Sequence, residues 1–270
     1  MAEQIKTSSE PQGTLACVGL GMTLGAHITP ITEEHIRTSD VCFVAASDAL
    51  VELWVSEMHD DVRSLQEYYS SDQSRQQTYK NMIEAVLTEL RTGKRVVGIF
   101  YGHPGVFAYV PHQLVKQART EGFSAIMEPG ISAEDCLIAD LGIDPGRFGC
   151  QQYEASQYLF YHRVIDPSAY LILWQIGVVG DLNYGIEVTS GEYRRLLLEL
   201  LYTQYSKEHP IILYEAATVP IQKHRAEEIP LHQLIEADLK DYTTLVIPPA
   251  HAMKKNLELI ERIKAISLID

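Results

Sequence analysis

Arg95-Val-Val-Gly-Ile-Phe-Tyr101 is an apolar run that leads directly into the glycine-containing turn Gly102-His-Pro-Gly-Val-Phe107. A run of this length, bounded by turn residues, is typical of a strand that is buried on both faces of a sheet. Similar runs cover residues 15–19, 41–45 and 123–127. Segments with helical periodicity lie between them, and this alternation predicts βαβ units with a mostly parallel sheet. The sequence therefore predicts an α/β fold.

The segments between the strands carry start and stop signals of helices. Thr32 is placed to cap a helix over residues 32–38, and another helix is expected over residues 49–58. Apolar residues at steps of three and four mark one face of a longer helix: Tyr79, Ile83, Val86, Leu87 and Leu90. Gly93 suits the C-terminal cap of that helix, and Pro111 suits the first turn of the next one.

The second half of the chain has a different order of elements. Ser132 and Asp135 form a capping-box pair at the start of a helix that Gly142 would end. Strands are predicted at 170–174, 211–214 and 243–247, and helices at 192–205 and 251–266. We divide the chain into a polar leader (1–13), an N-terminal α/β domain (14–126), a C-terminal α/β domain (127–250) and a C-terminal amphipathic helix (251–270).

The composition is that of an ordinary globular chain. Of its 270 residues, 46% are apolar and 21% are charged, which excludes a mainly disordered chain, a collagen and a coiled-coil rod. A net charge of −14 argues against binding to a nucleic-acid backbone, which needs clustered Lys and Arg. The first 13 residues lack an apolar signal segment, and no apolar run approaches the ~20 residues of a membrane span, so a cytoplasmic location is expected.

Several common chemistries lack their motifs in this sequence. The four cysteines include no Cys-x-x-Cys pair and the ten histidines lack the spacing of ligands, so no metal site is expected. Val18-Gly-Leu-Gly-Met-Thr-Leu-Gly25 follows the first strand, but its third glycine comes one residue too late for a dinucleotide fingerprint. Taken alone, this loop is interpreted as a tight turn. Gly-x-Ser-x-Gly, phosphate-loop and His-Glu-x-x-His motifs are also absent.

Three stretches of sequence taken together indicate a family more specifically than any single motif does. Tyr101-Gly-His-Pro-Gly-Val-Phe107 and Glu128-Pro-Gly-Ile-Ser-Ala133 each follow a predicted strand, and Val18-Gly-Leu-Gly21 stands where a third such loop is expected. At this spacing they resemble the tetrapyrrole methylase superfamily, the class III S-adenosylmethionine methyltransferases, over roughly residues 14–250. The resemblance implies two α/β domains, the second with a mixed sheet, and S-adenosylmethionine bound in the cleft between them.

One subset of that superfamily, the borosin-type peptide backbone α-N-methyltransferases, is more similar still. Its members have Tyr-Gly-His-Pro-Gly-Val-Phe at this turn and an Arg-x-x-x-Tyr pair ahead of the preceding strand, here Arg75 and Tyr79. Further similar stretches are Tyr153-Glu-Ala-Ser-Gln157, Leu173-Trp-Gln-Ile-Gly177 and Tyr214-Glu-Ala-Ala217. Fused fungal members carry their own substrate peptide at the C-terminus. This chain stops soon after residue 266, so we expect it to act on a separate, ribosomally made precursor.

The resemblance implies catalytic roles for Arg75, Tyr79 and Tyr101. The spacing of Arg75 and Tyr79 alone would instead favour a structural interpretation, in which a solvated Arg stacks on a Tyr one helical turn away. A backbone amide is a poor nucleophile, so its methylation needs loss of the N–H proton and donors for its oxygen. Our hypothesis is that Arg75 favours the phenolate of Tyr79, which takes the proton directly or through water. Tyr101 would hold the methyl group and the amide in line. Tyr68 or Tyr69 lines the same site, with Tyr68 preferred, and which Tyr is the base stays open.

For S-adenosylmethionine, and its product S-adenosylhomocysteine, the resemblance suggests contacts from Tyr101, His103, Val106, Phe107, Gln175, Ala216, Thr243 and Thr244. The alternatives are structural. His103 is also interpretable as an exposed loop histidine, and Gln175 as a satisfied hydrogen-bonding group beside Trp174. Thr243 and Thr244 can also be explained by their place in a predicted strand, because β-branched residues are common in strands. Ser132 is interpreted as a helix cap and not as a ligand.

The family forms homodimers, so the resemblance implies a homodimer and a 2:2 complex with the precursor. The predicted helix at 251–266 has Leu257, Ile260 and Ile263 on one face, and we interpret it as a packing or dimer helix. Two rival functions are a porphyrinoid or corrin C-methyltransferase of the same superfamily and a non-catalytic relative that only binds a peptide. The Arg75 and Tyr79 pair argues against the first rival, and the intact Tyr101 turn argues against the second.

Overall fold

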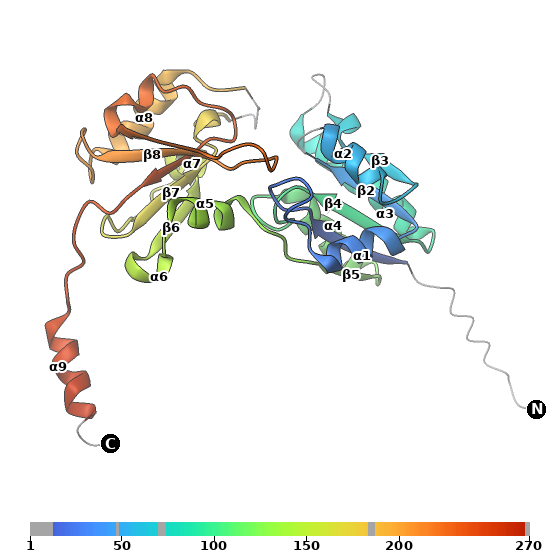
Figure 1. Cartoon of the computed structure of the whole chain (residues 1–270), viewed down its shortest axis with the longest axis horizontal. Coiled ribbons are helices and arrows are strands. Elements are labelled where there is room, and N and C mark those ends of the chain that lie inside the picture. The colour runs from blue at the N-terminus through green and yellow to red at the C-terminus, as the bar shows by residue number, and fades with distance from the viewer. Residues whose placement is uncertain (1–12, 47–48, 70–73, 183–186, 268–270) are drawn as a thin grey trace, which may run out of the picture. The chain divides into compact units, whose positions relative to one another are not determined.

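The computed structural model describes residues 13–46, 49–69, 74–182 and 187–267 (Figure 1). They form two compact units. The first contains the described parts of Met1–Gly142, Leu182–Tyr184 and Glu215–Arg225, and the second those of Ile143–Asp181, Gly185–Tyr214 and Ala226–Asp270. The predicted leader lies outside the described residues except for Gly13. The predicted domain boundary after residue 126 stays a prediction.

A five-stranded sheet in the order β3-β2-β4-β1-β5 organises the first unit (Figure 1). Its strands are β1 (Thr14–Gly19), β2 (Val41–Ala45), β3 (Val62–Ser64), β4 (Arg95–Phe100) and β5 (Ser124–Met127). All neighbouring strands run parallel, which confirms the predicted parallel sheet. The loops after β1, β4 and β5 therefore leave the sheet at the same edge, where ligands of such sheets bind.

Helices bury both faces of this sheet. They are α1 (Pro30–Thr38) and α2 (Ala49–Ser56) on one face and α3 (Arg75–Arg91) and α4 (Tyr109–Thr120) on the other, with a 3₁₀ turn η1 (Gln66–Tyr68) before α3. The helix α5 (Ala133–Leu141) follows β5. Leu15 and Cys17 share one core cluster with apolar residues of α3 and α4. Ala16 and Val18 belong to a second cluster with residues of α1 and α2. Alternate residues of β1 thus face opposite cores, as a strand covered on both sides requires.

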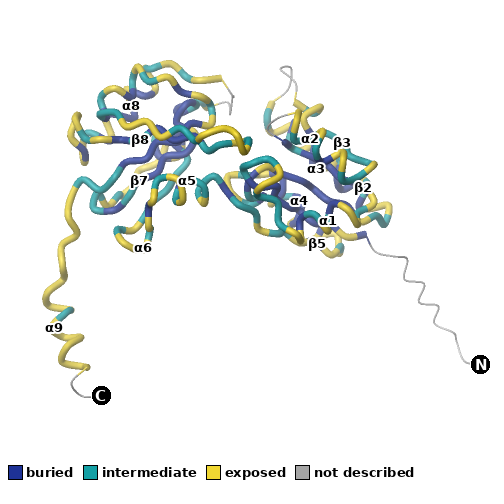
Figure 2. Tube along the Cα trace, in the orientation of Figure 1, coloured by how far each residue is buried: buried dark blue, intermediate teal, exposed yellow. Residues whose placement is uncertain are grey.

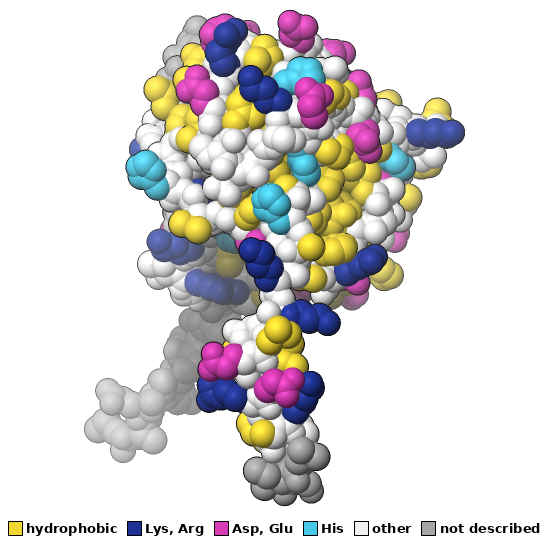
Figure 3. All heavy atoms as spheres, turned by 90° about the vertical axis from the view of Figure 1, so that its left-hand side faces the viewer, with side chains coloured by type: hydrophobic (Ala, Val, Ile, Leu, Met, Phe, Trp, Pro, Cys, Tyr) yellow, Lys and Arg dark blue, Asp and Glu magenta, His cyan; other side chains and the backbone are white. Residues whose placement is uncertain are grey.

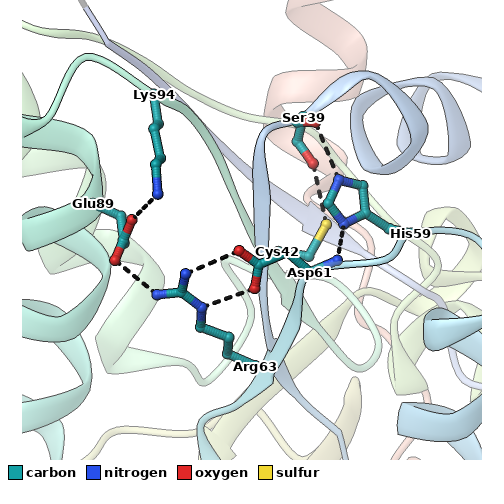
Figure 4. A network of polar contacts seen from close by, with 7 residues as sticks. All are labelled: Ser39, Cys42, His59, Asp61, Arg63, Glu89 and Lys94. Atoms are coloured by element: carbon teal, nitrogen blue, oxygen red, sulfur yellow. Dashed lines mark hydrogen bonds and ion pairs between the residues drawn. The ribbon is translucent and has the colours of Figure 1, made fainter.

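Ion pairs hold the edge strand β3 in place (Figure 4). Arg63 of β3 donates to Asp61 at 2.9 Å and to Glu89 of α3 at 2.7 Å. Lys94 pairs with the same carboxylate of Glu89. The hydrogen bond from Arg63 holds the pKa of Asp61 below its usual range. This strand was not predicted, because its three residues form no apolar run.

One helix start differs from the prediction. Thr29, and not Thr32, caps α1, because its hydroxyl accepts a hydrogen bond from the Thr32 amide at 3.2 Å. Pro30 then takes the first helical position, where the backbone N–H has no partner within the helix and its absence costs no hydrogen bond. Thr32 is instead buried, and its hydroxyl donates to the carbonyl of Gly19 at 3.4 Å. The predicted capping box at Ser132 is confirmed.

The second unit contains a mixed sheet in the order β6-β7-β10-β8-β9. Its strands are β6 (Cys150–Glu154), β7 (Tyr170–Trp174), β8 (Pro210–Glu215), β9 (Arg225–Pro230) and β10 (Thr244–Ile247). β6 runs parallel to β7, whereas β10 runs antiparallel to β7 and β8, which confirms the mixed sheet. The remaining helices are α6 (Pro145–Phe148), α7 (Ala155–Phe160) and α8 (Gly191–Leu201), with 3₁₀ turns η2 (Ile176–Val178) and η3 (Leu231–Ile235).

The C-terminal helix is shorter than predicted. α9 (Leu257–Ile266) begins after Asn256, whose side chain accepts a hydrogen bond from the Leu259 amide at 3.1 Å, so residues 252–256 are not helical. None of its residues is buried, as the yellow and teal tube of Figure 2 shows. α8 likewise ends at Leu201, before the predicted residue 205. In the part of the chain that the structure describes, no helix has the length and apolar character to cross a lipid bilayer.

Candidate active site

Three glycine loops of the first unit converge on the carbonyl group of Gly102. Gly21 and Gly102 exchange two backbone hydrogen bonds, of 3.2 and 2.9 Å, which tie the loop after β1 to the turn after β4. A Cβ atom on Gly19 would lie 2.2 Å from the Gly102 oxygen, and one on Gly130, in the loop after β5, 2.6 Å from it. Any side chain at Gly19 or Gly130 would force these loops apart, so their close contact requires glycine.

The turn between β4 and α4 presents aromatic side chains to solvent. Tyr101 is 54% exposed and Phe107 55% exposed. The amide of Gly105 donates to Nδ1 of His103 at 2.9 Å, and His112 of α4 contacts the Gly105 carbonyl at 2.9 Å. Because these bonds fix the turn from within, its exposed rings are held in place before any ligand binds.

Phe107 and Gln175 share an unusual backbone conformation. They have φ angles of 49° and 58°, and among the described residues they are the only non-glycine positions with positive φ. Such conformations are costly for residues with a Cβ atom, and they concentrate at functional sites. Both residues were predicted to contact the cofactor on other grounds.

Arg75 is the centre of a group of aromatic side chains in the first unit. It is the first residue of α3, after the N-cap Ser74, and Tyr79 follows one turn later. The Arg75 guanidinium donates to the Tyr79 hydroxyl at 3.4 Å and lies over the ring of Tyr69, 4.9 Å from its centre. Tyr79 in turn stacks on Tyr109 of α4, with 5.7 Å between ring centres. We call Tyr69, Arg75, Tyr79 and Tyr109 the Arg75 cluster.

The electrostatics of Tyr69 connect the Arg75 cluster to the turn after β4. Partial burial raises the pKa of Tyr69, and the neighbouring phenols of Tyr79 and Tyr101 raise it further, against the opposing effect of Arg75. Tyr69 therefore keeps its proton at neutral pH and remains a hydrogen-bond donor. Tyr109 of the cluster follows Phe107 of the turn by two residues, so the cluster adjoins this turn.

Tyr68 has a different environment from its neighbour. It ends the 3₁₀ turn η1, is half-buried and packs against the core beneath α3 and α4. The catalytic role predicted for Tyr68 therefore stays a prediction, while Tyr69 is the residue stacked on Arg75. Tyr109 was not among the predicted site residues, although its place just after the glycine turn, at the start of a helix, marks it as a neighbour of the turn.

Three of the predicted cofactor contacts lie together in the second unit. Gln175 follows β7 and is exposed, and Thr243 and Thr244 are buried at the start of β10. The amide of Ile176 donates to the Thr243 carbonyl at 2.9 Å, so the two segments are neighbours. The Thr243 hydroxyl accepts a hydrogen bond from the Lys240 amide at 2.8 Å, which gives it a structural part in this turn.

The segment after β8 contacts the first glycine loop. Ala216 is half-buried there and belongs to the first unit. Its neighbour Ala217 accepts a hydrogen bond from the Thr23 hydroxyl at 3.0 Å, and Leu24 donates to the Thr218 carbonyl at 2.9 Å. Within the described residues, no group of three or more His, Cys, Asp and Glu side chains is placed to hold a metal ion.

A family model of the tetrapyrrole (corrin/porphyrin) methylases matches residues 14–231. The chain belongs to this family. The matched range contains all three converging glycine loops and the Arg75 cluster. The resemblance seen in the sequence motifs is therefore confirmed.

Relatives of this tetrapyrrole methylase are similar along nearly its whole length. A methyltransferase and ribosomally synthesized cyclic peptide (gymnopeptides) precursor from Gymnopus fusipes is 33% identical over 268 residues, which are 97% of this chain and 64% of that protein. A methyltransferase and type I borosin cyclic peptide precursor from Coprinopsis marcescibilis is 36% identical over 249 residues, 90% of this chain and 64% of that protein. The chain thus spans less than two thirds of the length of these relatives.

A solved structure agrees with the fold. Uroporphyrin-III-C-methyltransferase from Thermus thermophilus has a TM-score of 0.61 to this tetrapyrrole methylase, at 17% identity, over 88% of this chain and 93% of that one. At this identity the similarity shows the fold alone. It confirms the α/β architecture with one parallel and one mixed sheet.

Proposed function

We propose that this member of the tetrapyrrole methylase family transfers the methyl group of S-adenosylmethionine to backbone amide nitrogens of a ribosomally made precursor peptide. The observation that carries the proposal is the Arg75 cluster beside the turn after β4. Its guanidinium and phenols suit a planar, uncharged amide, since they offer hydrogen bonds to the oxygen and a base for the N–H. The names of the relatives, which combine a methyltransferase with a peptide precursor, support the same substrate class.

The residues of the glycine turn fit S-adenosylmethionine, which supplies an electrophilic methyl group when bound. The contact of Gly19, Gly102 and Gly130 holds the three loops together at the edge of the sheet where ligands of such folds bind. Exposed apolar and aromatic groups of the turn suit an adenosine and a sulfonium. We propose that the cofactor is held by Tyr101, His103, Val106, Phe107, Ala216, Gln175, Thr243 and Thr244.

The Arg75 cluster activates the amide in this proposal. Arg75 and the protonated Tyr69 donate hydrogen bonds to the amide oxygen, which gains negative charge as the nitrogen loses its proton. That proton passes to the side-chain oxygen of Tyr79, directly or through water. Bound S-adenosylmethionine would supply the methyl carbon, and its sulfur–carbon bond would break as the amide nitrogen bonds to that carbon, which would give S-adenosylhomocysteine. Tyr101, directly after β4, holds the methyl group and the nitrogen in line in this proposal.

We further propose a homodimer that binds two separate precursor peptides. α9 supports this, because Leu257, Ile263 and Ile266 are each more than 60% exposed, and an isolated helix of 10 residues is marginal in water. Figure 3 shows hydrophobic side chains beside charged ones on α9. A second copy of the chain is the proposed cover for this apolar face. All four cysteines are free, which suits the proposed cytoplasmic location.

The test supplies S-adenosylmethionine and a probe peptide, acetyl-Gly-Val-Val-Ile-Val-Gly-amide, and follows the peptide mass. A parallel sample carries the same six residues fused behind Asp270 through a Gly-Ser linker, and a third receives uroporphyrinogen III. Mass gains of whole methyl groups on the free peptide are expected. Methylation of the fused form alone would contradict the separate precursor. Methylation of uroporphyrinogen III, with neither peptide changed, would overturn the proposed function.

A further inference from the structure

Tyr109 connects the side chain of Tyr79 to the turn after β4. Its ring stacks on the ring of Tyr79, with 5.7 Å between the ring centres and 29° between the ring planes. Its backbone begins α4, two residues after Phe107 of the turn. Tyr109 therefore contacts the proposed base directly and continues the segment that is proposed to hold the methyl donor.

The first turn of α4 gives the Tyr109 ring a rigid support. Val110 and Pro111, which follow Tyr109 directly, are both buried. His112, in the same turn of the helix, contacts the Gly105 carbonyl at 2.9 Å and so ties the turn after β4 to α4. Because packed interiors resist displacement, the backbone of Tyr109 keeps a fixed place relative to that turn.

The position of the Tyr79 hydroxyl depends on how the Tyr79 ring is held. The hydrogen bond from Arg75 measures 3.4 Å, which is longer than the roughly 2.7–3.2 Å that is usual for such bonds. The ring is half-buried and packs against the core beneath α3 and α4, but rotation about its side-chain bonds would still carry the hydroxyl away from Arg75. An aromatic stack favours one ring position by a factor of roughly 2 to 10, so the contact with Tyr109 adds substantially to the hold.

We propose that Tyr109 is a positioning residue, whose ring fixes the Tyr79 hydroxyl relative to the turn that holds the methyl donor, an inference that rests on the proposed peptide methylation. Proton removal and methyl transfer act on the same nitrogen, so the base and the donor must keep a constant separation. A misplacement of about 1 Å can cost roughly 100-fold in rate. The ring of Tyr109, and not its hydroxyl, has this role, because a stack needs only the aromatic face.

The first measurement separates kcat from KM for the probe peptide. Tyr109→Leu, which lacks the ring, should lower kcat by roughly 10- to 100-fold and leave KM for S-adenosylmethionine within about 2-fold of the wild-type value. Since Tyr109 is 56% exposed, the loss of its ring opens no core cavity, and urea unfolding should change little. Tyr109→Phe, which keeps the ring, should restore kcat to within about 2-fold of the wild-type value.

Tyr193→Leu is the matched control for the loss of an exposed Tyr ring. Tyr193 is 42% exposed in the first turn of α8 and lies outside the Arg75 cluster, so the variant should keep the wild-type kcat. A wild-type kcat for Tyr109→Leu would overturn the proposal. So would an equal fall of kcat in Tyr109→Phe and Tyr109→Leu, because the hydroxyl would then be the group that matters.

The second measurement does not depend on methylation. Difluorotyrosine in place of Tyr79 reports the surroundings of that ring by fluorine NMR. Tyr109→Leu should move and broaden the fluorine resonance, because the ring current and the support of the neighbouring ring are lost, and Tyr109→Phe should keep it near the wild-type position. An unmoved resonance in Tyr109→Leu would overturn the proposal even if the peptide is methylated. If the resonance moves but no peptide is methylated, the proposed function fails and the hold of Tyr109 on Tyr79 stands.

Discussion

The guanidinium of Arg75 lies over the ring of Tyr69, 4.9 Å from its centre. A flat cation stacked on a flat ring keeps its N–H edge free to donate in its own plane, and one such bond reaches the Tyr79 hydroxyl at 3.4 Å. The same geometry suits the oxygen of a planar amide. Stacking and donation at one residue explain why an Arg, and not a Lys, stands at the start of α3.

Arg75→Lys should keep the positive charge but lose both the stacking on the Tyr69 ring and the planar set of N–H donors of the guanidinium. We expect methylation to slow by roughly 100-fold, the cost of losing one aligned donor to a developing oxyanion. The free energy of unfolding should change by less than about 0.5 kcal/mol, because the site is half-buried at a helix start. Single-turnover mass spectrometry measures the rate. Arg91→Lys, at the other end of α3, is the control and should keep the wild-type rate.

Tyr79→Phe should remove the proposed base and retain the stack on Tyr109. We expect the turnover rate to fall by roughly 100-fold or more, the usual contribution of a general base. Binding of S-adenosylmethionine, measured by calorimetry, should not change. Tyr109→Phe keeps the ring but lacks the hydroxyl, and it should be nearly fully active. A Tyr79→Phe enzyme with the wild-type rate would assign the base to another group.

Gln175→Gly should separate stability from cofactor binding. Glycine adopts a φ of 58° without the Cβ penalty, so we expect the free energy of unfolding to rise by about 0.5–1 kcal/mol. The loss of the side chain should weaken S-adenosylmethionine binding by roughly 10-fold. Urea unfolding and calorimetry give the two values. Gln157→Gly, in helix α7, should instead destabilise by about 1 kcal/mol. A lower free energy of unfolding for Gln175→Gly would show that the backbone at this position is not strained. An unchanged affinity for S-adenosylmethionine would show that the Gln175 side chain does not contact the cofactor.

Stability should fall in alkali. Burial raises the pKa of Cys17 from 9.0 to about 12 and that of Tyr205 from 10.0 to about 12. The unfolded chain therefore releases these protons first, and the stability that they contribute is present below pH 9 and lost as the pH rises to 12. Cys17→Ala should reduce the slope of unfolding free energy against pH by up to about 1.4 kcal/mol per unit. An unchanged slope between pH 9 and 12 would contradict the burial of this thiol.

Ile263→Glu should disrupt the proposed homodimer. Ile263 is 61% exposed on α9, and a carboxylate there would be costly to bury against a second copy. We expect sedimentation at micromolar concentration to give a dimer for the wild type and for Arg262→Glu, and a monomer for Ile263→Glu. A monomeric wild type would refute the dimer and leave the apolar face of α9 to another partner.

The central strands could be predicted from sequence because both faces of β1, β2 and β4 are buried. β6 and β9 could not, since Cys150–Glu154 is half-buried and Arg225–Pro230 is largely exposed and charged, as edge strands often are. Spacing placed Arg75 one turn before Tyr79. It could not distinguish Tyr68 from Tyr69, because adjacent residues at the end of a 3₁₀ turn point in different directions and only packing decides which meets Arg75. The stack of Tyr79 on Tyr109 joins α3 to α4, a contact that no local pattern encodes.

Tandem mass spectrometry of the probe peptide after incubation with S-adenosylmethionine locates every added methyl group. Fragments from the wild-type reaction should carry the methyl group on backbone nitrogen, and Arg75→Lys should leave nearly all of the peptide unmodified in the same time. Methyl groups on side chains or termini, or equal backbone methylation by Arg75→Lys, would show that the Arg75 cluster does not activate a peptide amide.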